Sequence, residues 1–211
     1  MKRYAFELTA HQVTDFFTPI RNKTDIIRLL MKSIKTMLVL PPTEPQLGRN
    51  ELVLVVAKMS RLFYFSEDKY FSITFPFTAL ETDGHLDFTS NTVSYIDSRT
   101  TSDVLAVLKQ EENFNSTCPY QFVEPVLDIV NHEKAFWPFL LSLFMYEDGY
   151  IRYDYDEQRA NADSHPLNHY DVFYSSNSTC KVGLRDRIVN DIMVDFLSTE
   201  SNCHYLEQLP T

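Results

Sequence analysis

Residues 52–75 read LVLVVAKMSRLFYFSEDKYFSITF, and this stretch decides the fold class. Three of its runs, at 52–57, 62–65 and 70–75, are rich in β-branched and aromatic residues. Glu67 and Asp68 separate the last two runs, where we expect a hairpin turn. Two shorter strands are expected at 86–88 and 92–96, so the segment 51–96 is predicted to be β-rich.

Helical patterns lie on both sides of this β-rich segment. Thr9 and Gln12 have the spacing of a capping box, which predicts a short helix over 9–18 that stops at Pro19. Apolar residues at helical spacing predict a basic amphipathic helix through 26–38. Further helices are expected at 100–108, 122–130, 136–146 and 188–197, with a loop at 111–120. The helix at 136–146 is apolar on all sides, which is typical of a central core helix or of an interface.

Strands and helices are clustered along the chain, and this arrangement favours the α+β class over a strictly alternating fold. We expect a single domain in which helices pack on an antiparallel sheet, with helical elements at both ends of the chain. Its predicted parts are a basic helical N-terminal segment (1–40), the β-rich segment (51–96), a helical segment (100–146), a β-hairpin region (150–184) and a C-terminal helix (185–206).

Composition excludes several classes of protein. With 44% hydrophobic and 14% aromatic residues, the chain of 211 residues is too apolar to be disordered. Its four glycines, Gly48, Gly84, Gly149 and Gly183, lie far apart, so no glycine-rich phosphate loop can form locally. Three scattered cysteines without a C-x-x-C pair argue against a zinc ribbon and suit a reducing compartment. No signal peptide or membrane span is recognisable, and a cytoplasmic location is expected.

Charge is distributed unevenly around a net value of −10. Residues 1–70 carry a net charge of +4, and residues 71–211 carry −14. The chain as a whole should therefore repel nucleic acid, although the basic first third could contact nucleic acid or an acidic partner. The alternative is that these cations form an ordinary solvated helix face. The partner expected is another protein or a second copy of the chain, and not a membrane.

Residues 150–171 contain the densest group of chemically active side chains. Two alternating runs, 150–156 and 169–174, predict strands, and a third strand is expected at 181–184. Because side chains two residues apart share a face, Arg152 and Asp154 would meet His169 and Asp171 if the first two strands pair. His165 lies in the connection between them. These five residues are the candidate site.

Three interpretations of this cluster remain open. In the first, His165 and His169 act as acid and base, or one of them acts with Asp154 or Asp171 orienting its ring, and Arg152 or Arg159 stabilises a phosphorane. In the second, His165, His169 and Asp171 bind a divalent metal, the one cofactor considered. Pro166 argues against a helical H-x-x-x-H metal motif. In the third, the residues form cross-strand pairs with a purely structural role.

Three segments, Tyr150 to Asp156, His165-Pro-Leu-Asn-His169 and Val182-Gly-Leu184, resemble a family of bacterial proteins classed only as a domain of unknown function. The resemblance covers about the last third of the chain. It implies a prokaryotic cytosolic protein associated with mobile-element, toxin–antitoxin or phage-defence loci. It supplies no established catalytic residues, so it draws attention to this segment without assigning its chemistry.

Two functions follow as hypotheses. The leading one is an accessory subunit of a prokaryotic antiviral defence or toxin–antitoxin type system that acts through protein–protein contacts. It is supported by the acidic segment, the basic N-terminal helix, the aromatic excess and the lack of a complete catalytic motif. The alternative is a small nuclease or other phosphodiester hydrolase that uses His165 and His169 with Asp154 or Asp171 and Arg152.

Overall fold

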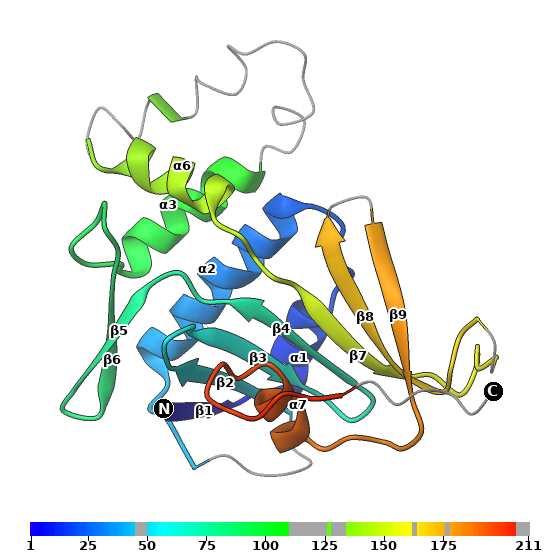
Figure 1. The fold of residues 1–211 in the computed structure, drawn as a ribbon. Helices are drawn as coiled ribbons and strands as arrows, with labels where there is room; N and C mark the ends of the chain where they lie inside the picture. Colours follow the sequence, from blue (N-terminus) through cyan, green and yellow to red (C-terminus); the bar gives the residue numbers. More distant parts are fainter. Residues whose placement is uncertain (45–49, 110–125, 128–133, 162–163, 176–177, 206–211) are drawn as a thin grey trace.

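A seven-stranded sheet in which all neighbouring strands are antiparallel forms the centre of the computed structural model (Figure 1). The structure describes residues 1–44, 50–109, 126–127, 134–161, 164–175 and 178–205. The strands follow the order β1 (Lys2–Glu7), β2 (Glu51–Val56), β3 (Arg61–Phe65), β4 (Lys69–Thr74), β7 (Ile151–Tyr155), β8 (Asn168–Ser175) and β9 (Ser178–Leu184). A separate hairpin joins β5 (Thr78–Thr82) to β6 (His85–Thr89).

Helices cover the two faces of the sheet unequally (Figure 1). On one face lie α1 (Ala10–Phe16) and α2 (Lys23–Val39), with α3 (Ser98–Lys109) and α6 (Phe136–Met145) packed against α2. The short α7 (Asn190–Phe196) covers the opposite face. The fold is thus α+β, as the clustered elements predict.

Two apolar cores hold these layers together. The larger one lies between the sheet and α1, α2, α3 and α6, and it includes Ile27, Leu30, Tyr64 and Phe139. The smaller one lies under α7 and includes Phe63, Tyr153 and Met193. Adjacent residues of one strand, such as Phe63 and Tyr64, point into different cores because side chains alternate between the faces of a sheet.

Local sequence signals explain where the first helices begin. Thr9 and Gln12 form the predicted capping box at the start of α1. A second capping box, made by Asn22 and Asp25, begins α2. The buried residues of α2 recur at helical spacing, so the predicted amphipathic helix is confirmed and extends from Lys23 to Val39.

Several expected boundaries were wrong. The segment 1–40 is not purely helical, because β1 occupies its start and pairs with β2. Residues 92–96 form bends and irregular backbone rather than a strand, and β5 was not anticipated. The C-terminal helix spans only 190–196 of the predicted 185–206. The expected loop at 111–120 and most of the helix at 122–130 lie outside the described residues.

Helix α6 is not a central core helix. One side of it is buried through Phe136, Phe139, Leu140 and Leu143. On the other side, Leu141 is 44% exposed and Met145 is 74% exposed. The overall apolarity of this helix is therefore not explained by the core, and interface is the remaining interpretation of its sequence.

Several cations of the basic first third form ion pairs within the chain. In α2, Arg28 pairs with Asp25, and Lys32 pairs with Asp15. Lys23 reaches Asp148, while Arg3 reaches Asp191 in α7. The positive charge of residues 1–70 is therefore matched in part by carboxylates of the same fold. In the part of the chain that the structure describes, no helix combines the length and apolarity needed to cross a membrane.

Candidate functional site

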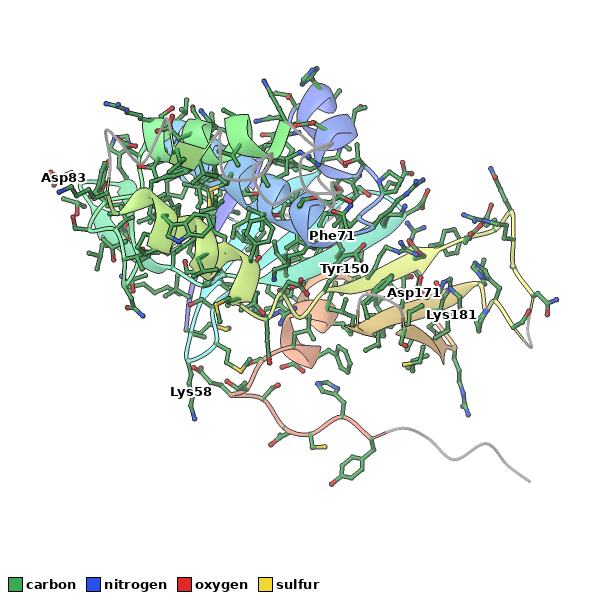
Figure 2. The ribbon with its side chains drawn as sticks, turned by 90° about the horizontal axis from the view of Figure 1, so that it is seen from above. Lys58, Phe71, Asp83, Tyr150, Asp171 and Lys181 are labelled. Atoms are coloured by element: carbon green, nitrogen blue, oxygen red, sulfur yellow. The ribbon has the colours of Figure 1, made fainter. Side chains whose placement is uncertain are left out.

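The charged cluster occupies two cross-strand rows on the half of the sheet formed by β4, β7, β8 and β9. The first row runs Lys69, Asp154, His169 and Gly183. The second row runs Phe71, Arg152, Asp171 and Lys181. Figure 2 shows Phe71, Tyr150, Asp171 and Lys181 following one another across the sheet. The register thus confirms that strands 150–156 and 169–174 pair, and it places Arg152, Asp154, His169 and Asp171 on one face.

Arg152 joins the two carboxylates. Its Nε donates to Asp154 Oδ2 at 2.6 Å, and its Nη2 donates to Asp171 Oδ2 at 2.5 Å. The other Asp171 oxygen, Oδ1, accepts from the Lys181 ammonium at 2.7 Å. Asp171 is buried and pairs with two cations that keep part of their surface in solvent. Such mutual pairing is what a buried carboxylate needs to stay ionised.

His169 is fully buried, and its hydrogen bonds define its tautomer. Nδ1 donates to the carbonyl oxygen of Pro166 at 2.7 Å, so the lone pair lies on Nε2. Nε2 accepts from the ammonium of Lys181 at 3.0 Å. The nearest oxygens of Asp154 and Asp171 are each 4.0 Å from Nε2, beyond hydrogen-bonding distance. Pro166 and Lys181 therefore orient this imidazole, in place of the two carboxylates expected from the sequence.

His165 belongs to a different hydrogen-bonded group. Its ring lies edge-on to that of His169, with 4.5 Å between the ring centroids. Its Nε2 is 3.2 Å from Asp156 Oδ2, and the same oxygen is 3.0 Å from Arg159 Nε. The two histidines are thus neighbours, but each one is held by its own partners.

A close contact between the His-Pro turn and β9 explains why His169 is buried. Gly183 lies directly opposite His169 across the β8–β9 pair. A methyl group on Gly183 would lie 2.9 Å from Cγ of Pro166, so only glycine leaves room for the proline ring. The turn folds over the end of the sheet and covers the imidazole. His165-Pro-Leu-Asn-His169 and Val182-Gly-Leu184 therefore form one structural unit.

Neighbouring groups lower the pKa values of Asp171 and Asp156. Burial by itself would raise the pKa of Asp171, but the hydrogen bond from Lys181 and the charge of Arg152 outweigh it, and the pKa lies below its ordinary value. Burial would also raise the pKa of Asp156, but hydrogen bonds from Arg159 and His165 outweigh this effect, and the pKa lies below its ordinary value. Both carboxylates are therefore ionised near neutral pH.

The structure brings the five candidate residues into one region, but it divides them between two groups. Arg152, Asp154, His169 and Asp171 form the cluster, whereas the ring of His165 is hydrogen-bonded to Asp156 and contacts the ring of His169. Lys181 was missed as a member, although it lies in a predicted strand at a position that shares the face of Asp171. Its pairing depends on the register between β8 and β9, which one strand's pattern does not define.

The cluster in this arrangement does not fit the metal interpretation. Ligand atoms of Asp154, His169 and Asp171 lie within 4.8 Å of one another, whereas the expected set contained His165 in place of Asp154. Asp154 Oδ1 is buried and accepts no hydrogen bond in the described part of the chain. However, Arg152 occupies the inner oxygens of both carboxylates and Lys181 occupies Nε2 of His169. The chain's own cations fill the place that a metal ion would take.

A cavity of about 500 Å³ lies beside the cluster, between the start of α2 and the beginning of β7. Tyr150 and Phe173 form part of its wall and stack on each other, with ring centroids 4.6 Å apart. Arg152 lies next to this wall, 5.7 Å from the centre of the Phe173 ring. Burial raises the pKa of Tyr150 to about 12, although Arg152 partly opposes the shift.

Comparison of the chain with protein-family models, with curated proteins and with solved structures finds no match in any of the three. The functional argument therefore rests on the residues of this chain and on their arrangement.

Proposed function

We propose that this protein is an accessory subunit that acts by binding another protein, in a prokaryotic defence or toxin–antitoxin type system. The observation that carries the proposal is the exposed apolar stripe of α6, which we define as Trp137, Leu141 and Met145, spaced four residues apart. Large apolar side chains lined up on one helix face are typical of a surface that packs against a partner helix. The association with defence or toxin–antitoxin loci comes from the resemblance of the last third.

Charge favours a basic partner protein over a second copy of the chain. The net charge is −10, so two copies repel each other at long range. Part of the positive charge of the first third is already paired inside the fold, for example in the pairs of Lys23 with Asp148 and of Lys32 with Asp15. A basic protein that presents an apolar patch would be attracted by the acidic surface and held by the α6 stripe.

The state of the charged cluster supports the same proposal. His169 is fully buried, and both oxygens of Asp171 are already paired. A general base must reach the proton that it removes, and a buried imidazole that accepts from Lys181 does not reach a substrate. In this proposal the cluster stabilises the sheet, and the protein acts by binding its partner at the surface of α6.

The direct test is co-purification of the full chain with the product of each gene that lies next to its own, expressed in pairs. We expect one pair to form a complex of defined stoichiometry that weakens as salt is raised. Leu141→Glu should abolish the complex, because a charge then lies in the centre of the stripe. Ile192→Glu in α7 is the matched control, since Ile192 is 46% exposed, close to the exposure of Leu141.

Other outcomes would contradict the proposal in distinct ways. A wild-type chain that forms a dimer through α6 in light scattering would replace the basic partner with a second copy. A monodisperse chain that binds none of the neighbouring products, and turns over a substrate alone, would remove the interaction role. Trp137 is the only tryptophan, so its fluorescence reports whether the stripe is covered in any complex.

The second candidate is a phosphodiester hydrolase, favoured by the 4.5 Å contact between the rings of His165 and His169 beside Arg152 and Lys181. Single- and double-stranded DNA and RNA would be the substrates. If hydrolysis occurs, His165→Ala should lower its rate by a factor of about 10²–10⁴, the usual contribution of an acid or base. Activity that survives in the folded double variant His165→Ala/His169→Ala would eliminate this candidate.

A further inference from the structure

We propose that the cavity beside the charged cluster binds a free nucleotide, independently of the partner at α6. The cavity measures about 500 Å³, within the usual range of small-molecule sites. It opens between the start of α2 and the segment 146–150. Its walls offer one group for each part of a nucleotide.

The aromatic wall suits a planar base. Tyr150 and Phe173 stack at an interplanar angle of 26°, and Phe71 meets Tyr150 edge-on behind them. Phe173 is only partly buried, although it is a large apolar side chain that lines the cavity. Stacking of a base on an aromatic side chain is tolerant of base identity, so we expect little discrimination among the four bases.

Two charged residues that line the cavity suit the phosphate and the ribose of a nucleotide. Arg21 and Glu147 both line the cavity and are exposed, and neither forms an ion pair with any described residue. A guanidinium is the side chain best matched to phosphate, and a carboxylate accepts hydrogen bonds from ribose hydroxyls. Lys23 also lines the cavity, but Asp148 and the Tyr146 carbonyl already occupy it, so Arg21 is the cation available for phosphate.

Calorimetric titration of the full chain tests the assignment, with adenosine, AMP, GMP, CMP and UMP as the ligands. All four nucleotides should bind with similar affinity, and adenosine should bind more weakly. Phe173→Leu should weaken AMP binding about tenfold, the size expected for one stacking contact. Arg21→Gln should weaken AMP to the level of adenosine and leave adenosine unchanged.

Arg99→Gln is the matched control, because Arg99 is an exposed arginine in α3, outside the cavity, and binding should not change. Thermal unfolding of each variant separates lost binding from lost folding, and Arg21 is exposed enough for its variant to fold normally. Absence of heat with all five ligands at millimolar concentration would overturn the assignment. So would equal affinities of folded Phe173→Leu and the wild type, or an oligonucleotide that binds far more tightly than AMP.

Discussion

At the scale of single residues, Asp171 is the side chain on which the charged cluster depends. Asp171→Asn would leave Arg152 and Lys181 without the carboxylate that they share. Removal of one partner from a fully buried pair costs about 3–5 kcal/mol, and we expect about 2 kcal/mol here because both cations are partly exposed. Urea unfolding measures the loss.

Asp83→Asn is the control for this substitution. Asp83 lies in the β5–β6 turn with φ of 52°, a conformation that asparagine also adopts readily. The substitution removes one exposed negative charge, so it should change the free energy of unfolding by less than about 0.5 kcal/mol. An Asp171→Asn variant as stable as Asp83→Asn would show that the cluster does not stabilise the sheet.

The lowered pKa of Asp171 also predicts a dependence on pH. A carboxyl whose pKa is lower in the folded chain stabilises the fold at pH values above its unfolded pKa, about 3.9. This contribution is lost as pH falls through the folded pKa. The urea midpoint of the wild type should therefore drop more between pH 5 and pH 3 than that of Asp171→Asn. Parallel curves for the two proteins would contradict the assignment of charge to Asp171.

At the scale of elements, the contact between the His-Pro turn and β9 predicts that Gly183 cannot be enlarged. Gly183→Ala forces Pro166 away, because the new methyl group would lie 2.9 Å from Cγ of a rigid ring. We expect a loss of about 1–2 kcal/mol, typical of overpacking, measured by thermal unfolding. Cys180 in the same strand is exposed, so Cys180→Ala is the control and should leave the stability unchanged. Displacement of Pro166 should also expose His169, which the NMR chemical shifts of the imidazole would detect.

At the scale of the whole molecule, β1 makes the first residues essential. Tyr4, Ala5, Phe6 and Leu8 are buried, and Phe6 is completely so. Each large apolar side chain buried contributes about 1.5–3 kcal/mol, and the total stability of a domain is about 5–15 kcal/mol. Deletion of residues 2–8 should therefore prevent folding, which circular dichroism would detect as lost structure and light scattering as aggregation.

Arg3→Gln in full-length protein is the control for the deletion. It removes only the exposed ion pair with Asp191, so stability should change by less than about 0.5 kcal/mol. If the chain without residues 2–8 remains monomeric and unfolds cooperatively, β1 is an appendage and not part of the core.

The residues and elements with strong local patterns were predictable from the sequence. The capping box at Thr9, the stripe of α2 and the alternation of 150–156 are properties of neighbouring residues, and each produced the expected element. In contrast, β1 carries little alternation and becomes a strand because β2 supplies its hydrogen-bond partners. The exposure of one side of α6 was not predictable, since its sequence is apolar on every side.

Local patterns along the chain are enough to predict the α+β class, the strands that carry the charged residues, and the face that each residue shares with its neighbours two positions away. Which of these residues touch depends on how distant segments pack. Lys181 joins Asp171 through strand register, and Pro166 reaches His169 because Gly183 leaves space for it. The physical reason is that periodicity is a local property, whereas register, burial and charge pairing depend on segments that are distant in the chain.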